Sequence, residues 1–313
     1  MSQAMRRAVI DVGTNSVKVL IADVDGSEVT PVAEESNQTR LGAGFYATHQ
    51  LRPSAMAKTA EAVSKYAARA TAMGAVSVRV IATSAARDAL NATELVDAVQ
   101  RAAGLSMEIL TGQQEADGVF RGVTSQAKLA RVPVLILDVG GGSTEFIVGE
   151  NSVPRFSHSY ALGSVRLLEK LQPEDPPGLD ALARCRAELQ DFLGGHVAPE
   201  LEPALSRNQP NTQLVGTGGT AAILARMENG DEDFQREKIE ATTVSLPRVR
   251  AWLEDLWRQP LASRQKIKGL PRDRADVILT GTAIYEAIMQ RFGFAQLQIS
   301  TRGLRYWALL QAP

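Results

Sequence analysis

Two segments of this chain, residues 9–21 and 135–148, carry the same succession of residue types. Each reads as an apolar strand, an acid, a glycine turn with hydroxyl residues and a second apolar strand, so that Asp11 aligns with Asp138. A glycine turn between two strands is most often only a β-hairpin. Two copies in register indicate more than that. They predict two related α/β halves, each opened by such a hairpin.

The turns also carry candidate ligand-binding groups. A carboxylate at a strand end can hold a hard cation, and backbone N–H groups and hydroxyls of the turn can bind phosphate oxygens. A third glycine loop, residues 215–220, leads into a helix-like segment. The candidate cation ligands are Asp138, Glu145 and Asp11. The candidate phosphate ligands are Gly13, Thr14, Asn15, Ser16, Gly140, Gly141, Gly142, Ser143, Thr144, Gly218, Gly219 and Thr220.

Composition excludes several classes of protein. A chain of 313 residues is long for one core, which favours two domains. Its net charge of −1 argues against a general nucleic-acid-binding protein. The single cysteine, Cys185, allows no intramolecular disulfide and no thiolate-rich zinc site. Neither a signal peptide nor a membrane-spanning apolar run is expected, so we expect a cytoplasmic protein without a membrane partner.

The periodicity of the sequence predicts a similar order of elements in each half. In the first half, strands are expected within residues 8–24 and at 29–34, 76–82 and 107–110, with helices at 53–73, 92–103 and 113–123. In the second half, after the second glycine turn, we expect a helix at 180–193, a loop at 199–210, a strand near 239–245, helices near 247–257, 260–268 and 274–292, a strand at 297–300 and a helix at 304–310. This layout resembles the actin-like, ribonuclease-H-like fold, whose active site lies in an interdomain cleft. Fold alone does not identify a reaction.

Seven motifs, which follow one another along the chain, narrow the resemblance from this fold to a single family. They lie at residues 11–16, 82–89, 112–116, 138–145, 163–167, 216–220 and 274–278. In combination they resemble the exopolyphosphatase/guanosine pentaphosphate phosphohydrolase (Ppx/GppA) family in its short two-domain form. The resemblance implies an α/β protein of two actin-like domains. Residues 1–124, joined by the C-terminal helix 301–313, form the first, and residues 125–300 form the second.

The resemblance also implies roles for single residues. Glu115 takes the position of the catalytic base, and Asp138 and Glu145 take positions associated with a divalent metal, Mg²⁺ or Mn²⁺. The chain departs from the family pattern at two places. Gln114 replaces the first of two adjacent glutamates, and Tyr306 follows the motif Gly-Leu-Arg where the family has glutamate.

Hydrolysis of a terminal phosphoanhydride needs an oriented water, a base and positive charge on the phosphoryl oxygens. Arg87 is the expected phosphate ligand, and Arg40 and Arg166 are expected contacts to a longer polyanion. We expect a Mg²⁺-dependent exopolyphosphatase that releases orthophosphate from inorganic polyphosphate. Three alternatives stay open: a guanosine pentaphosphate (pppGpp) 5′-phosphohydrolase, an actin-like kinase, and a non-catalytic relative that binds (p)ppGpp. Nucleic acid is not an expected partner, and a homodimer is an open alternative.

Overall fold

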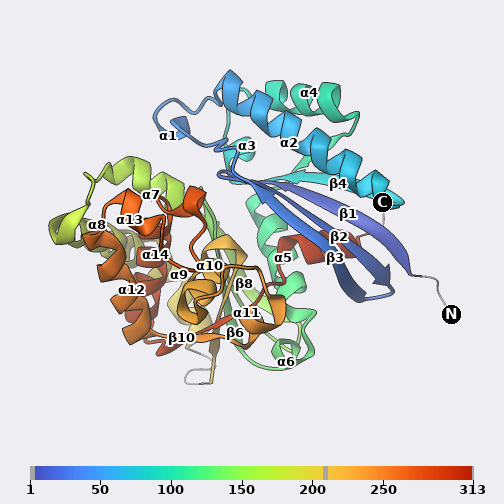
Figure 1. The fold of residues 1–313 in the computed structure, drawn as a ribbon. Helices are drawn as coiled ribbons and strands as arrows, with labels where there is room; N and C mark the ends of the chain where they lie inside the picture. Colours follow the sequence, from blue (N-terminus) through green and yellow to red (C-terminus); the bar gives the residue numbers. More distant parts are fainter. Residues whose placement is uncertain (1–3, 207–210, 312–313) are drawn as a thin grey trace. The chain divides into compact units, whose positions relative to one another are not determined.

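The computed structural model describes residues 4–206 and 211–311. The chain divides into two compact units, coloured along the sequence in Figure 1. Unit 1 comprises the described residues of Met1–Ser125 and Leu304–Pro313, and unit 2 comprises those of Gln126–Gly303. The sequence prediction had drawn the first boundary after residue 124 and had given residues 301–313 to the first domain.

Unit 1 is built on a five-stranded sheet in the order β3-β2-β1-β4-β5. The strands are β1 (Met5–Val12), β2 (Val17–Asp25), β3 (Glu28–Asn37), β4 (Ser77–Ala82) and β5 (Met107–Ile109). Strands β1, β2 and β3 form an antiparallel meander, whereas β4 and β5 extend the sheet in parallel. The chain returns to β4 and β5 through helices, as parallel pairing requires.

Helices cover both faces of the unit 1 sheet (Figure 1). They are α1 (Phe45–Thr48), α2 (Pro53–Ala72), α3 (Ser84–Arg87), α4 (Ala92–Ala103), α5 (Gly112–Thr124) and α15 (Leu304–Leu310). Helices α2 and α4 lie on one face, and α5 and α15 lie on the other. An added Cβ on Gly118 of α5 would lie 2.7 Å from the Trp307 ring, so this glycine lets α15 approach closely.

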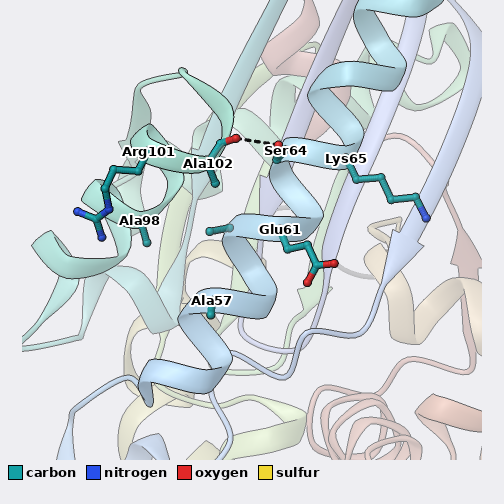
Figure 2. A pocket seen from close by; sticks show the side chains of 8 residues that line it. Ala57, Glu61, Ser64, Lys65, Ala98, Arg101 and Ala102 are labelled. Atoms are coloured by element: carbon teal, nitrogen blue, oxygen red, sulfur yellow. Dashed lines mark hydrogen bonds between the residues drawn. The ribbon is translucent and has the colours of Figure 1, made fainter.

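Small side chains allow α2 and α4 to pack closely. Figure 2 shows Ala57 on α2 and Ala98 and Ala102 on α4 along a groove of about 670 Å³. Ser64 closes the contact by donating its hydroxyl hydrogen to the Ala102 carbonyl at 2.8 Å. None of the residues predicted for the functional site lines this groove.

Unit 2 repeats the same sheet plan. Its strand order is β10-β11-β9-β6-β7-β8. The strands are β6 (Val134–Val139), β7 (Thr144–Glu150), β8 (Val153–Tyr160), β9 (Gln213–Thr217), β10 (Thr243–Ser245) and β11 (Gln296–Ile299). Strands β6, β7 and β8 form a meander equivalent to β1, β2 and β3, and β9 and β11 pair in parallel as β4 and β5 do. The repeat predicted from the two glycine turns is therefore confirmed, with β10 added at one edge.

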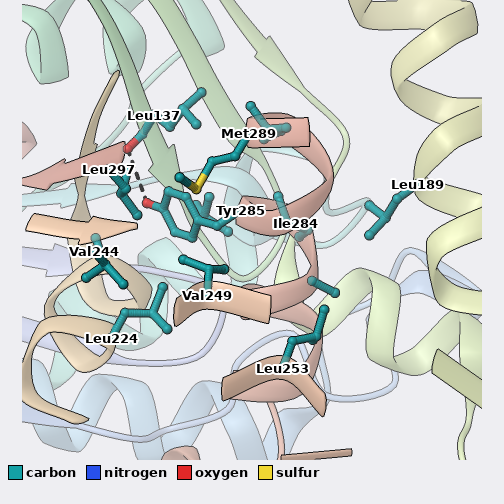
Figure 3. Packing of buried hydrophobic residues seen from close by; sticks show 14 of the residues in the cluster. Leu137, Leu189, Leu224, Val244, Val249, Leu253, Ile284, Tyr285, Met289 and Leu297 are labelled. Atoms are coloured by element: carbon teal, nitrogen blue, oxygen red, sulfur yellow. Dashed lines mark hydrogen bonds between the residues drawn. The ribbon is translucent and has the colours of Figure 1, made fainter. Parts of the chain in front are cut away.

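The helices of unit 2 enclose a large apolar core, part of which is shown in Figure 3. They are α6 (Ala127–Ala130), α7 (Ser164–Leu171), α8 (Gly178–Phe192), the π-helical turn η1 (Leu193–Val197), α9 (Ala198–Leu205), α10 (Gly218–Asn229), α11 (Arg236–Ala241), α12 (Leu246–Arg258), α13 (Leu261–Arg264), the 3₁₀ turn η2 (Arg272–Arg274) and α14 (Ile278–Arg291). Trp257 and Tyr285 are both fully buried in this core. The core of unit 2 is therefore built around large aromatic side chains.

Two sequence predictions for unit 2 are wrong. The segment 199–210 was expected to be a loop because of its prolines, but α9 runs through residues 198–205, and residues 207–210 lie outside the described part of the chain. Pro199 occupies the first turn, where its missing N–H costs nothing, and Leu201 and Leu205 are buried one helical turn apart. The predicted strand near 239–245 is divided: residues 239–241 end helix α11, and only residues 243–245 form strand β10.

Two predicted helices of unit 2 are shorter than expected. Helix α13 ends at Arg264 rather than near residue 268. The helix expected from Arg274 begins only at Ile278, after a 3₁₀ turn. Arg264 explains the first difference, because its buried guanidinium donates to the Gln259 and Ala275 carbonyls at 2.7 and 2.9 Å. Arg264 thereby joins α13 to the segment after η2, a contact that hydrophobic periodicity does not reveal.

Candidate active site

The glycine turn of unit 1 joins β1 to β2. The Gly13 N–H donates to the Ser16 carbonyl at 3.0 Å, and this hydrogen bond closes the turn. The chain after β3 then packs onto the turn, where the Gly42 N–H donates to the Thr14 carbonyl at 2.7 Å. A Cβ on Gly42 would lie 2.3 Å from the Thr14 methyl group, so glycine is needed there. Predicted phosphate ligands Thr14, Asn15 and Ser16 are thus held in a buried turn.

The glycine turn of unit 2 joins β6 to β7 with the same closing bond. The Gly140 N–H donates to the Ser143 carbonyl at 3.0 Å. Here the turn is supported by the start of α7, where the Ser164 and Val165 N–H groups donate to the Gly140 and Gly141 carbonyls at 2.9 and 2.8 Å. These bonds orient the carbonyls of the turn toward α7. Within the described residues, no hydrogen bond is donated by the backbone N–H of Gly141 or of its neighbour Gly142.

The buried threonine hydroxyls of unit 2 bond to the protein itself. Thr144 donates its hydroxyl hydrogen to the Leu162 carbonyl at 2.5 Å. Thr220 donates to the Val139 carbonyl at 3.1 Å. A hydroxyl has one hydrogen to donate, so in this structure both groups hold the site together. Phosphate ligation by their side chains stays a prediction, and the backbone N–H groups are the better placed donors.

Two carboxylates lie side by side on the β6–β7 hairpin. Asp138 and Glu145 are direct partners across the antiparallel pair, which puts their side chains on one face of the sheet. Glu145 is 2% exposed and accepts hydrogen bonds from Ser143 at 2.9 Å and Ser159 at 2.7 Å. The Asp138 carboxylate lies against the third glycine loop, because a Cβ on Gly218 would be 2.1 Å from its Oδ1 atom.

This pair suits a hard divalent ion. Mg²⁺ is usually held by one or two carboxylates together with water and substrate phosphates. Among residues 4–206 and 211–311, no group of three or more histidine, cysteine, aspartate or glutamate side chains is arranged to hold a metal. The third predicted ligand, Asp11, belongs to unit 1. Metal binding by Asp11, Asp138 and Glu145 stays a prediction, and the donor chemistry of the unit 2 pair fits it.

Asp11 has basic neighbours. It pairs across the β1–β2 hairpin with Lys18. Burial lowers the pKa of Arg305, but the nearby charges of Glu34 and Asp11 outweigh that effect and raise the pKa overall. Arg305 also forms an ion pair with Glu34 at 2.6 Å. The Asp11 carboxylate is thus partly balanced by cations of its own unit.

The predicted base and the predicted phosphate arginine of unit 1 are bonded to each other. Arg87, at the end of α3, donates from Nη1 to Glu115 Oε2 at 2.7 Å and to the Leu110 carbonyl at 3.2 Å. Glu115 is 7% exposed and lies in the first turn of α5. A helix N-terminus and an arginine both favour the ionised carboxylate. The arrangement therefore joins the predicted base to the predicted phosphate ligand, and both roles stay predictions.

The family departure at Gln114 has a structural role. Thr111 caps α5 by accepting from the Gln114 N–H at 3.2 Å, and the Gln114 side chain accepts from the Thr111 N–H at 2.8 Å. This is a capping box, in which glutamate and glutamine serve equally. Gln114 therefore keeps the helix start that presents Glu115.

The other departure lies in α15. Tyr306 is buried, and the Trp307 ring lies 5.3 Å from the guanidinium carbon of Arg79. Tyr306 and Trp307 belong to unit 1 and contribute to its packing. The altered segment therefore stabilises the face of the sheet that α5 and α15 cover.

The two remaining predicted arginines differ in their surroundings. Arg40 is exposed in a left-handed backbone conformation, φ 54°, and its N–H donates to the Asn15 carbonyl at 3.0 Å. Arg166, on α7, donates from Nε to the Gly142 carbonyl at 2.8 Å. Arg166 thus supports the second glycine turn directly, while Arg40 borders the first. Their contacts to a polyanion stay predictions.

The sequence prediction missed Ser159, whose hydroxyl orients Glu145. The signal is the register of β7 with β8, in which Glu145 pairs with Ser159. That register contains a bulge near Gly149, so it could not be counted out from the sequence.

Comparisons with known proteins agree with this architecture. Residues 20–311 match the Ppx/GppA phosphatase family, and the chain belongs to that family. Exopolyphosphatase 2 of Mycobacterium tuberculosis is 33% identical over 311 residues, which cover 94% of each chain. Exopolyphosphatase 1 of Mycobacterium bovis is 28% identical over 308 residues, covering 98% of this chain and 88% of the relative.

Solved structures give the same result. A Ppx/GppA family member from Aquifex aeolicus superposes with a TM-score of 0.78 at 28% identity, covering 98% of this chain and 96% of that one. An exopolyphosphatase from Cytophaga hutchinsonii superposes with a TM-score of 0.86 at 27% identity, covering 97% and 96%. The predicted family and the predicted α/β fold of two actin-like domains are therefore confirmed. These matches support a phosphatase of the Ppx/GppA family. In the described part of the chain, no helix has the length and apolar character needed to cross a bilayer.

Proposed function

We propose that the protein is a Mg²⁺- or Mn²⁺-dependent exopolyphosphatase, which hydrolyses the terminal phosphoanhydride of inorganic polyphosphate and releases orthophosphate. The observation that carries this proposal is the contact of 2.7 Å between the buried Glu115 carboxylate and the half-buried Arg87 guanidinium. It joins a base to a phosphate-type ligand in a chain that belongs to a phosphatase family. The names of the mycobacterial relatives support polyphosphate as the substrate class.

In the proposed reaction, Glu115 accepts a proton from a water molecule whose oxygen bonds to the terminal phosphorus. The phosphorus–oxygen bond to the rest of the chain breaks, and a polyphosphate shorter by one phosphate leaves together with orthophosphate. Phosphate oxygens compete with Glu115 for the donors of Arg87. Substrate binding would thus loosen the 2.7 Å contact and make the carboxylate a stronger base.

The residues of unit 2 would bind the phosphates and the cation. Asp138 and Glu145 would hold the divalent ion, which would neutralise charge on the phosphoryl oxygens. The backbone N–H groups of Gly141 and Gly142 point to no other acceptor among the described residues and can donate to phosphate. Arg166 fixes the turn that carries them.

The test is phosphate release from long-chain polyphosphate, tripolyphosphate and guanosine pentaphosphate, with Mg²⁺ and no acceptor, at two ionic strengths. We expect the highest kcat/KM for the long chain and a steep fall in its apparent affinity with salt, since several arginines would displace counterions. A higher kcat/KM for guanosine pentaphosphate would favour the 5′-phosphohydrolase. Absence of phosphate release from every substrate would favour a non-catalytic (p)ppGpp-binding protein. A homodimer and a cytoplasmic location stay predictions from the sequence.

A further inference from the structure

We propose that Tyr285 is a positioning residue of the candidate active site: its hydroxyl bridges the ends of β6 and β9 and thereby fixes the Asp138 carboxylate over the Gly218 turn. The inference deepens the proposed function and rests on it for its kinetic consequences. Its structural consequence, the placement of one candidate metal ligand, can be measured without any substrate.

The geometry places the hydroxyl between two neighbouring strands. Tyr285 lies on α14 with 0% of its surface exposed, and its oxygen is 3.4 Å from the Leu137 carbonyl (Figure 3). The same oxygen is 3.4 Å from the Thr217 carbonyl. These two carbonyls belong to the residues directly before Asp138 and Gly218. One hydrogen shared between two acceptors therefore spans both strand ends at the point where the functional residues begin.

The pairing of the strands makes this position sensitive. Leu137 pairs with Gly216, and Asp138 pairs with Thr217, as the last partners of the parallel β6–β9 ladder. A Cβ on Gly216 would lie 3.0 Å from the Tyr285 oxygen, so the glycine leaves room for the phenol ring end. The hydroxyl thus adds a cross-strand link where the ladder itself stops.

Core packing alone does not account for a hydroxyl here. The ring of Tyr285 lies among apolar side chains, including Val244, Val249, Met289 and Leu297 (Figure 3). Phenylalanine would fill the same space without the cost of burying a hydroxyl whose hydrogen bonds are imperfect. The two 3.4 Å contacts are longer than ideal, so they recover only part of that cost. The link between the ends of β6 and β9 accounts for the hydroxyl, whereas apolar packing does not.

Asp138 is the group that gains from this link. Its Oδ1 atom occupies the space that a Cβ on Gly218 would take, at 2.1 Å from that position. With so little clearance, a small change in the separation of the β6 and β9 ends moves the carboxylate relative to the start of α10. Relaxed strand ends would then present Asp138 and Glu145 in a poorer arrangement for a shared cation.

Unit 2 offers a matched control. Tyr160 is also a buried tyrosine, 6% exposed, and its hydroxyl donates to Glu200 Oε2 at 2.6 Å, where it links β8 to α9. Substitution Tyr160→Phe removes the same atom, from a shorter hydrogen bond, without touching the ends of β6 and β9. Any general effect of losing a buried tyrosine hydroxyl should therefore appear in this variant as well.

The experiment compares wild type, Tyr285→Phe and Tyr160→Phe. Mn²⁺ binding to the substrate-free protein is measured from the electron paramagnetic resonance signal of free Mn²⁺, and thermal stability is recorded in parallel. We expect Tyr285→Phe to weaken Mn²⁺ binding by about threefold to tenfold, the range for loss of one hydrogen bond, and Tyr160→Phe to leave it unchanged. Equal Mn²⁺ affinity in all three proteins overturns the proposal, whatever the stability.

Two further measurements separate the possible failures. Amide hydrogen exchange should be faster at residues 138–140 and 217–220 in Tyr285→Phe only, even if that variant is less stable. In the phosphate-release assay, the same variant should need more Mg²⁺ but keep its KM for polyphosphate at saturating Mg²⁺. If wild type releases no phosphate, the proposed function fails, while Mn²⁺ binding and hydrogen exchange still decide the role of Tyr285.

Discussion

The glycine turn of unit 1 and that of unit 2 are closed by the same 3.0 Å bond, from Gly13 to Ser16 and from Gly140 to Ser143, but they are surrounded by different chemistry. In unit 1, the parallel neighbour of β1 is β4, which is followed by the short helix α3 with Arg87, and this arginine is paired with a glutamate. In unit 2, the parallel neighbour of β6 is β9, which is followed by a glycine loop with two carboxylates beside it.

The difference teaches how a duplicated scaffold can divide a reaction. The turn itself is fixed by backbone hydrogen bonds and needs only glycine and small polar residues, so both copies keep it. The residues after the neighbouring strand take no part in the bond that closes the turn, and they differ between the two units. Unit 1 carries the candidate base and the candidate phosphate-binding arginine, whereas unit 2 carries two candidate cation ligands.

The largest effect is expected for Glu115→Gln in unit 1. Loss of a positioned general base typically reduces turnover by about 10²–10⁴-fold. Because the substitution also releases Arg87 from its ion pair, KM for polyphosphate should not rise. The measurement is steady-state phosphate release, with Glu94→Gln, an exposed glutamate in the first turn of α4, as the matched control. If Glu115→Gln keeps more than roughly a tenth of wild-type turnover, the base is another group.

A smaller effect is expected when the acids of the two turns are compared. Asp138→Asn should raise the Mg²⁺ concentration needed for half-maximal activity by about tenfold or more, because a cation held by one or two carboxylates loses much of its binding with one charge. Glu145→Gln should act in the same direction. Asp11→Asn should have less effect, since Arg305 and Lys18 lie beside that carboxylate. Equal shifts for Asp11 and Asp138 would show that both turns contribute ligands equally.

Much of this architecture could be predicted from the sequence, for a physical reason. Acid, glycine and serine at fixed spacing between two apolar runs specify a hairpin locally, and the duplication made the assignment firm. The strands and helices of unit 1 are likewise local patterns of periodicity 2 and 3.6. They needed no knowledge of distant contacts.

The remainder depends on contacts between distant segments. The Arg87–Glu115 pair joins residues on α3 and α5, and nothing in either motif shows that the glutamate and the arginine are partners. Ser159 reaches Glu145 only through the register of β8. Helix α9 was missed because its prolines were taken as loop formers, although its buried leucines decide the conformation. Contacts of this kind, between residues far apart in the sequence, cannot be predicted from hydrophobic pattern or residue propensity.

The third prediction contrasts the residues after β9 and β4. Gly218 has φ +81°, and an added Cβ would lie 2.1 Å from Asp138 Oδ1, so Gly218→Ala is strained by roughly 1–3 kcal/mol and must displace the carboxylate. We expect weaker Mn²⁺ binding by up to about tenfold. In unit 1, the first residue of the helix that follows β4 is Ser84, as Gly218 is of the helix that follows β9. The buried Ser84 hydroxyl has no partner among the described residues, so Ser84→Ala should change little. Direct Mn²⁺ titration of both variants measures the contrast, and an unaffected Gly218→Ala would remove Asp138 from the cation site.

The smallest effect concerns acid stability. Glu228, in the last turn of α10 in unit 2, accepts from Arg248 at 3.0 Å and from Trp252 at 2.8 Å, and the Arg248 hydrogen bond lowers the pKa of this carboxyl. A carboxyl whose pKa is lowered by folding stabilises the folded state at pH values above its pKa in the unfolded chain, which is about 4.3. That stabilisation is lost as the pH falls through the pKa of the folded state. At neutral pH, Glu228→Gln should therefore reduce the free energy of unfolding by no more than about 1 kcal/mol, because the pair is partly exposed. The difference from wild type should shrink below the unfolded pKa and vanish once the pH is below the folded pKa of Glu228.

In unit 1, Asp23 is bonded to Arg6 at 2.8 Å, and the pKa of Asp23 is also lowered by that bond, but both side chains are 34% exposed and, among the described residues, no tryptophan donates to this carboxylate. Asp23→Asn is accordingly the matched control, for which thermal unfolding between about pH 3 and pH 7 should follow wild type. A larger loss for Asp23→Asn than for Glu228→Gln would mean that burial and the Trp252 contact do not strengthen the unit 2 pair.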